Sequence, residues 1–151
     1  MESQLAHLNN HLVVCGFGRM RRLVCEEFSA AGFPFVIIDR DPRVLQDFSL
    51  SHGIPLSGDA TDDDVLKQAG VERARALVSV AASDADNLYI VMSARFINER
   101  LVIVARAESD TADRKLLRAG ATVVATTRFP HDAAKRYAGE LARFAPKEDS
   151  R

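Results

Sequence analysis

Tryptophan is missing from the 151 residues of this chain, which contains only two cysteines, five prolines and eight glycines. Two cysteines, Cys15 and Cys25, cannot form the disulfide framework of a small secreted domain. The composition excludes a disordered, collagen-like or coiled-coil chain. No apolar run approaches the ~20 residues that cross a bilayer, and residues 1–10 lack the basic and apolar parts of a secretory signal. We therefore expect a cytoplasmic location and no direct insertion into a membrane.

An excess of charge of one sign is missing as well. Lys and Arg total 20 and Asp and Glu total 21, which gives a formal net charge of −1 at pH 7. Binding of nucleic acid through its phosphates needs a concentrated basic face, so we expect no nucleic-acid partner. Hydrophobic residues make up 47% and charged residues 27% of the chain, which is typical of one ordinary globular domain.

Short apolar runs alternate with segments of helical spacing along the whole chain. The predicted strands are residues 12–15, 35–38, 54–57, 76–80, 101–105 and 122–125, and the longer predicted helices are 19–31, 83–97, 110–119 and 130–144. Parallel strands need a crossover between them, and such crossovers are usually helices. Six strands with five crossovers predict an α/β fold with one doubly wound parallel sheet of order 3-2-1-4-5-6.

Two helix starts carry the pattern of a capping box, in which a hydroxyl residue precedes an acidic residue by three positions. Thr61 with Asp64 predicts the start of a helix that ends near Gly70. Ser83 with Asp86 predicts the start of the helix over residues 83–97.

A ligand site is expected where the order of the strands reverses, beyond the carboxyl ends of strands one and four. Gly16 and Gly18 match the first two glycines of the dinucleotide fingerprint, which permit a tight turn and the close approach of a pyrophosphate. The start of the helix that follows favours an anionic ligand. Arg21 occupies the place of the third glycine, where it either reinforces a phosphate site or fills it.

Carboxylates follow the second and third strands. Asp39 lies 21 residues after Gly18, and an acidic residue there accepts hydrogen bonds from ribose hydroxyls and repels a 2′-phosphate, which favours NAD over NADP. The alternative is a solvated carboxylate at a strand end. Asp59 either accepts from an adenine amino group or precedes a capped helix.

Catalytic side chains are few. Three of the four histidines lie far from the expected crevice, the fourth starts the predicted helix 130–144, and the sequence has no nucleophile elbow, P-loop or metal-binding motif. The candidate hard-cation ligands near the crevice are Asp84, Asp86 and Glu108, and Arg106 between them argues against a closed cation site. A nucleotide site without such chemistry indicates a sensor and not an enzyme.

Six motifs occur in a fixed order: GFGR at 16–19, VIIDRDP at 36–42, GDAT at 58–61, ADNL at 85–88, VARA at 104–107 and LLRAGA at 116–121. Together they resemble the RCK (KTN, TrkA-N) domain, the regulator of potassium conductance. The resemblance covers nearly the whole chain, about residues 11–145. It implies a Rossmann-like cytosolic regulatory domain that gates a potassium channel or transporter when it binds NAD(H) or ATP/ADP.

The resemblance also implies a set of cofactor-binding residues. The phosphate loop would be formed by Gly16, Phe17, Gly18, Arg19 and Met20. Asp39 and Arg40 would hold the ribose, and Asp59 with Ala60 would lie beside the adenine. The crevice would be lined by Ala81, Ala82, Asp84 and Asn87, and Arg106 would face the phosphates or a ligand of a partner. Calcium is not expected, because Arg106 replaces a carboxylate of the calcium-gated members.

Members of this family pair into homodimers, assemble into rings and act on a membrane transport subunit, so the resemblance implies a location at the inner face of the membrane. It also makes residues 1–10 a linker-like segment and residues 11–145 the nucleotide-binding domain, followed by a frayed tail over 146–151. The apolar stripe of residues 130–144 belongs either to a helix that packs on a partner or to the ordinary sixth helix of the sheet. Two alternative functions remain: a structural assembly domain with a blocked site, and a fragment of an NAD-dependent oxidoreductase.

Overall fold

A computed structural model describes residues 2–16, 18–46 and 52–126, with the backbone alone at 2, 3, 18–21, 23, 44, 46, 125 and 126. The helix predicted over 130–144 and the predicted tail over 146–151 lie outside the described residues. Within the described ranges, no helix is long and apolar enough to cross a membrane.

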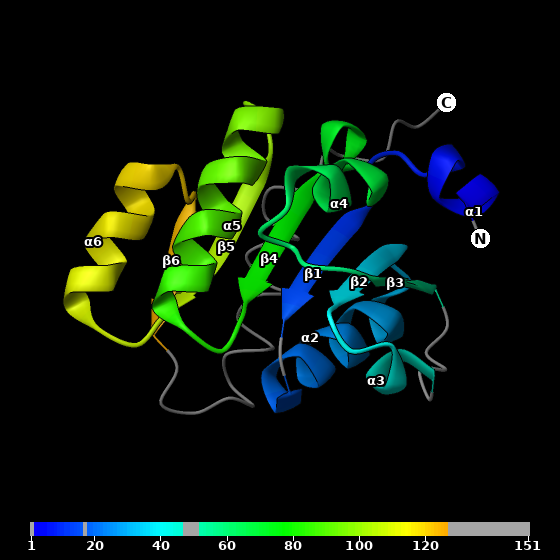
Figure 1. Cartoon of the computed structure of the whole chain (residues 1–151), viewed down its shortest axis with the longest axis horizontal. Helices are drawn as coiled ribbons and strands as arrows, with labels where there is room; N and C mark the ends of the chain where they lie inside the picture. Colours follow the sequence, from blue (N-terminus) through cyan, green and yellow to red (C-terminus); the bar gives the residue numbers. More distant parts are fainter. Residues whose placement is uncertain (1, 17, 47–51, 127–151) are drawn as a thin grey trace.

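One parallel sheet forms the middle of the molecule (Figure 1). Its strands are β1 (Leu12–Gly16), β2 (Phe35–Asp39), β3 (Gly53–Ser57), β4 (Ala76–Val80), β5 (Val102–Ala107) and β6 (Val123–Thr126). Their order is β3-β2-β1-β4-β5-β6, and all five neighbouring pairs are parallel. The predicted α/β fold and strand order are therefore confirmed.

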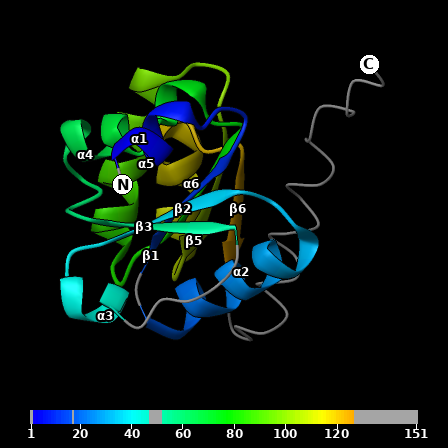
Figure 2. The same ribbon diagram turned by 90° about the vertical axis from the view of Figure 1, so that its right-hand side faces the viewer.

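Helices cover both faces of the sheet (Figure 2). One face carries α2 (Gly18–Ala31) and α3 (Pro42–Gln46), and the other carries α4 (Asp63–Gln68), α5 (Asp84–Ile97) and α6 (Asp110–Ala119). A short 3-10 helix, η1 (Val71–Arg73), leads into β4. The doubly wound arrangement brings the carboxyl ends of all strands to one edge of the sheet.

The alternation of side chains along β1 divides the core into two layers. Val13 and Cys15 belong to the layer under α4, α5 and α6, whereas Leu12 and Val14 belong to the layer under α2 and α3. All four side chains are buried, as expected for a central parallel strand that is covered on both faces.

A short helix that the sequence did not predict, α1 (Glu2–His7), lies within the segment that we expected to be linker-like. Leu5 is buried in the core layer of α4 to α6. The Arg73 guanidinium donates to the carbonyl oxygens of Leu8 (2.9 Å) and Leu5 (3.2 Å). These contacts explain how six residues form a helix, since so short a helix is unstable alone.

The predicted start of α4 is wrong by one residue. Asp62, and not Thr61, is the N-cap, and its carboxylate accepts from the backbone N–H of Asp64 at 2.9 Å. Thr61 instead donates both its backbone N–H and its hydroxyl to Asp59, so its side chain is not free to cap the helix. The predicted cap of α5 is confirmed, because Ser83 Oγ accepts from the N–H of Asp86 at 3.1 Å.

Strand β3 lies at one end of the strand order and contains a proline. Pro55 pairs with Ile37 in a register that continues from Gly53 to Ser57. Proline has no N–H to donate, and within sheets it is confined to edge strands and bulges. The position of Pro55 therefore agrees with the position of β3 in the sheet.

Candidate functional site

A cleft of about 280 Å³ opens at the carboxyl edge of the sheet, where the strand order reverses between β1 and β4. It is lined by Cys15, Gly16, Ile38, Asp39, Arg40, Asp41, Gly58, Asp59, Ala60, Thr61, Ala81, Ala82, Asp86 and Ile90. Apolar and small residues make up much of this lining, and among the described residues carboxylates and one guanidinium supply its charge. Such a mixture is typical of a small-molecule site, and the volume is near the lower end for one.

Half of the predicted binding residues meet at this cleft. They lie at or just after the ends of four different strands and are Gly16, Asp39, Arg40, Asp59, Ala60, Ala81 and Ala82. Gly18 is the first residue of α2, which begins two residues after β1. The side chains of Arg19, Met20 and Arg21, and all of Phe17, lie outside the described residues, so their predicted roles stay predictions.

The start of α2 supplies the part of the site that suits an anion. The first four backbone N–H groups of a helix have no partner within the helix, and the helix dipole places positive charge there. Because α2 starts at Gly18, two residues after Gly16 of the cleft, this positive end lies at the edge of the cleft. A phosphate group of a bound molecule is favoured at such a position.

Two consecutive turns hold the backbone after β2. A side-chain oxygen of Asp39 accepts from the N–H of Asp41 at 2.9 Å. Asp41 in turn accepts from the N–H of Arg43 at 2.9 Å and from its guanidinium at 3.2 Å. The side-chain and backbone hydrogen bonds of Arg43 lower the pKa of Asp41 below its ordinary value. The carboxylates in this loop are therefore held by the local backbone.

Asp59 is held in the same way after β3. Its Oδ1 atom accepts from the Thr61 hydroxyl at 2.7 Å and from the Thr61 N–H at 2.9 Å. These two hydrogen bonds, with a smaller contribution from the charge of Arg40, lower the pKa of Asp59. Asp59 is thus a fixed, ionised carboxylate at neutral pH.

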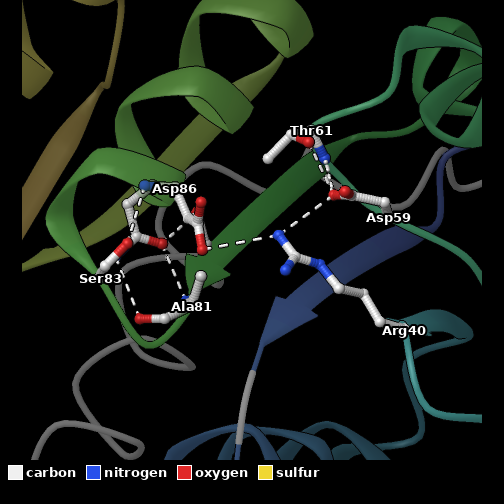
Figure 3. A network of polar contacts seen from close by, with 8 residues as sticks. Arg40, Asp59, Thr61, Ala81, Ser83 and Asp86 are labelled. Atoms are coloured by element: carbon white, nitrogen blue, oxygen red, sulfur yellow. Dashed lines mark hydrogen bonds and ion pairs between the residues drawn. The ribbon is translucent and has the colours of Figure 1, made fainter.

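Arg40 spans the cleft between two carboxylates (Figure 3). Its Nη2 atom lies 3.4 Å from Asp59 Oδ1 and 3.6 Å from Asp86 Oδ2. Arg40 follows β2, Asp59 follows β3 and Asp86 lies in the first turn of α5, so one side chain connects three elements. The guanidinium stays in contact with water, because 61% of the side chain is exposed.

Asn87 was predicted to line the crevice, and the structure places it behind the lining. Its side chain is buried. Its Oδ1 atom accepts from the Ser79 hydroxyl at 2.7 Å and from the Ala81 N–H at 2.8 Å. Its Nδ2 group donates to the carbonyl oxygens of Ala81 (3.3 Å) and Arg106 (3.2 Å). Asn87 therefore fixes the start of α5 to the ends of β4 and β5.

Asp84 and Arg106 also lie outside the cleft lining. Asp84 accepts from the backbone N–H of Glu108 at 3.1 Å and borders a second cavity, of about 310 Å³, between α5 and α6. The Arg106 guanidinium donates to Glu108 at 2.6 Å. No group of three or more potential metal-ligating His, Cys, Asp or Glu side chains occurs in the part of the chain that the structure describes.

The sequence analysis missed several residues of the cleft. Asp86 was interpreted as part of a capping box and as a possible cation ligand, and Ile90 was not singled out. Both project from the same face of α5, four residues apart, and this spacing was the available signal. Cys15 and Ile38 are register partners in β1 and β2, and each immediately precedes a residue that was predicted.

Comparison with known proteins agrees with the fold. The sequence model of the TrkA-N domain matches residues 12–127. Potassium channel protein 1 of Methanocaldococcus jannaschii is 43% identical over 123 residues, which cover 80% of this chain and 37% of the channel protein. The chain thus spans a little over a third of the length of this relative.

Solved structures share the fold. The TrkA-N domain of the inner membrane protein ybaL from Escherichia coli has a TM-score of 0.76 and 25% identity, and the match covers 89% of this chain and 98% of that one. The GsuK channel bound to NAD has a TM-score of 0.70 and 21% identity, with coverage of 78% and 21%. The fold, the match over residues 12–127 and the channel relative lead to one conclusion: this chain belongs to the TrkA-N domain family.

Proposed function

We propose that this chain is the ligand-binding regulatory domain of a potassium channel or transporter. It binds an adenine nucleotide, NAD(H) or ATP/ADP, in the cleft, and the bound nucleotide changes the arrangement of paired domains. The observation that carries this proposal is the cleft at the reversal of the strand order, with the start of a 14-residue helix at its edge.

The parts of the cleft suit the parts of a nucleotide. The start of α2 suits the phosphates, and Asp39 at the end of β2 suits the ribose hydroxyls. Small and apolar side chains, among them Ala60, Ala81 and Ile90, suit the flat face of a purine. The predicted contacts of Gly16, Asp39, Asp59 and Ala60 with such a ligand are part of this proposal.

The relatives support the transport role. The M. jannaschii relative is named a potassium channel protein, and the GsuK channel has been solved with NAD and with ADP. A ligand can move a protein between two states only through a difference in its affinity for them. We propose that the nucleotide binds the cleft more tightly in one of the two states, and that the membrane subunit responds to the change of state from the cytoplasmic side.

The lining of the cleft favours a sensor over an enzyme. Cys15 is the one thiol among the lining residues, and burial raises its pKa far above the ordinary value, so it is not a thiolate nucleophile at neutral pH. The Thr61 hydroxyl donates to Asp59, and the lowered pKa of this carboxylate makes it a weak base for activating the hydroxyl. Neither group is prepared for catalysis.

Binding is tested by calorimetry and thermal unfolding with NAD, NADH, ATP, ADP and calcium. A nucleotide at 100 times its dissociation constant should stabilise the chain by about 2.7 kcal/mol. Asp39→Ala should weaken binding, whereas Asp63→Ala, an exposed acidic residue of α4 outside the cleft, should not. If neither this chain nor Arg21→Gly responds to any nucleotide, the structural assembly role remains and the proposed function is wrong.

The partner that we propose for pairing is a second copy of this chain. Helix α5 exposes three large apolar side chains on its outer face, Tyr89 (61%), Met92 (50%) and Phe96 (85%), and Leu117 of α6 is 48% exposed. The α5 residues are spaced by three and four positions, so they form one stripe. A contiguous exposed apolar stripe of this kind marks an interaction surface. Residues 11–145 would then be the unit that pairs.

A further inference from the structure

Arg40 is the one cationic side chain among the described residues that line the cleft, whereas Asp39, Asp41, Asp59 and Asp86 are acidic. Its Nη2 atom lies between Asp59 (3.4 Å) and Asp86 (3.6 Å), on two sides of the cleft. Figure 3 shows the guanidinium directed between these two carboxylates. The charge of Arg40 is therefore compensated twice before any ligand arrives.

We propose that Asp59 and Asp86 make this cleft selective for adenine nucleotides with a free ribose 2′-hydroxyl, because they hold the arginine that would otherwise accept a 2′-phosphate. This inference rests on the proposed function and specifies the ligand class of the same site. It excludes NADP and other 2′-phosphorylated nucleotides as preferred ligands.

Arg40 lies where an arginine could bind a 2′-phosphate. In doubly wound folds, the residue that selects the ribose lies at the end of the second strand, and an arginine nearby accommodates a 2′-phosphate. Arg40 follows Asp39 directly, so the dipeptide joins an acidic residue that favours a free 2′-hydroxyl to an arginine that could accept a 2′-phosphate. The two contacts of Arg40 decide between them.

A 2′-phosphate would have to draw Arg40 away from both partners. Asp59 cannot follow the guanidinium, because Thr61 fixes its carboxylate with two hydrogen bonds. Asp86 is part of the first turn of α5, and this turn is capped by Ser83. Both carboxylates would stay at the cleft without their cation and would repel the phosphate.

The expected selectivity is moderate. The side chains of all three residues are partly exposed, at 61% for Arg40, 46% for Asp59 and 37% for Asp86, and exposed ion pairs contribute little individually. Removing one carboxylate should therefore lower the preference for the 2′-hydroxyl form by about two- to fivefold.

The test compares two probes that differ only in the 2′-phosphate, 5′-AMP and adenosine 2′,5′-bisphosphate, with binding measured by calorimetry at fixed salt concentration. Asp86→Asn is the main variant, because the Asp59 carboxylate also organises the turn at Thr61. Asp63→Asn removes the same charge from an exposed position outside the cleft and is the matched control. Both substitutions are also made in an Arg40→Gln background.

We expect Asp86→Asn to lower the ratio of the two affinities by about two- to fivefold, and Asp63→Asn to leave it unchanged. With Arg40→Gln present, Asp86→Asn should have a clearly smaller effect, since no arginine is left to release. An unchanged ratio in Asp86→Asn, or an equal change with and without Arg40, overturns the inference while nucleotide binding itself stands. Failure of the unaltered chain to bind 5′-AMP, NAD or ADP counts against the proposed function instead.

Discussion

Gly70 and Gly32 have the same backbone φ of 78° in different surroundings. A β-carbon at Gly32 would meet nothing within 4 Å, whereas one at Gly70 would lie 2.9 Å from a ring carbon of His11 and 2.8 Å from the Arg73 guanidinium. Arg73 has a flexible side chain, but the His11 ring is fully buried and cannot move aside. A substitution at Gly32 therefore measures backbone strain alone, whereas the same substitution at Gly70 adds a steric conflict.

We predict that Gly32→Ala lowers the free energy of unfolding by about 1 kcal/mol, which is the cost of the left-handed conformation. Gly70→Ala should cost about 2–3 kcal/mol, because it adds the conflict with His11. Urea unfolding of both variants measures the difference. Equal losses for the two would show that the surroundings of Gly70 adapt freely.

His11 gives the fold a dependence on pH. Its Nε2 atom donates to the Ala69 carbonyl oxygen at 2.8 Å, and its Nδ1 atom is buried without a hydrogen-bond partner among the described residues. Burial, assisted by the nearby charge of Arg73, lowers its pKa below 6.5. Protonation would add a buried positive charge and an Nδ1–H group that has no hydrogen-bond acceptor among the described residues.

Below pH 6.5, His11 binds a proton in the unfolded chain but stays neutral in the folded chain. The free energy of unfolding should therefore fall as the pH drops from 6.5 towards the lowered pKa. The slope from this residue is at most about 1.4 kcal/mol per pH unit. His11→Gln should remove this slope, whatever its effect at pH 7.5, in urea unfolding between pH 7.5 and 5. An unaltered slope in that variant would assign the effect to other groups.

Single residues were also where the sequence was least informative. Asp84 and Asp86 both belong to the first turn of α5 and are chemically identical, yet only Asp86 reaches the cleft. Asp39 could be predicted because a strand end has one place in the sheet. The choice between two positions of a helix turn depends on how the helix is rotated on the sheet, and the packing of the whole layer sets that rotation.

At the level of elements, Asn87 connects α5 to the sheet. It satisfies the Ser79 hydroxyl and the Ala81 backbone, and it donates to the Arg106 carbonyl oxygen. The same turn of α5 carries Asp86, which pairs with Arg40. The position of Asp86 at the cleft therefore depends on the anchoring of α5 by Asn87.

We predict that Asn87→Ala lowers the free energy of unfolding by about 3 kcal/mol, since it leaves a buried hydroxyl and backbone groups without partners. Ser79→Ala is the matched control. It removes one hydrogen bond but leaves the Ala81 N–H on Asn87, so it should cost about 1 kcal/mol. Chemical unfolding compares the two, and a loss for Asn87→Ala no larger than that for Ser79→Ala would contradict the anchoring role.

Helix starts show why local patterns succeed at one place and fail at another. Ser83 and Thr61 have the same spacing to an acidic residue, but only Ser83 is an N-cap. The Thr61 hydroxyl donates to Asp59, two residues earlier in the chain. The capping-box pattern considers only the residues after Thr61, so it does not take this hydrogen bond into account. Helix α1 was missed for a related reason, because its six residues depend on tertiary contacts of Leu5.

At the scale of the whole molecule, the order of the six strands followed from the sequence because alternating strands and helices with short connections leave few other topologies. The place of the cleft followed in turn from that topology. Its detailed lining did not, since contacts such as Arg40 with Asp86 join residues 46 positions apart.

Pairing of two copies through α5 gives a prediction at this scale. Phe96 is 85% exposed, so Phe96→Glu should leave the free energy of unfolding of the monomer within about 0.5 kcal/mol. The same substitution should weaken self-association by about tenfold or more, because a charge would enter an apolar contact. Sedimentation velocity over a concentration series measures this. The same association constant for both chains would exclude this face from the dimer.

The proline in β3 limits how copies of this molecule can join. An open edge strand is a template on which a neighbouring chain can extend a β-sheet, and a proline in that strand removes one of the donors such an extension would need. Pro55 lies at the middle of β3, so this border of the sheet is a poor place for strand addition. Growth by edge-to-edge polymerisation is thereby disfavoured there, and contact between copies is directed towards helical surfaces, where it can be reversible and of defined stoichiometry.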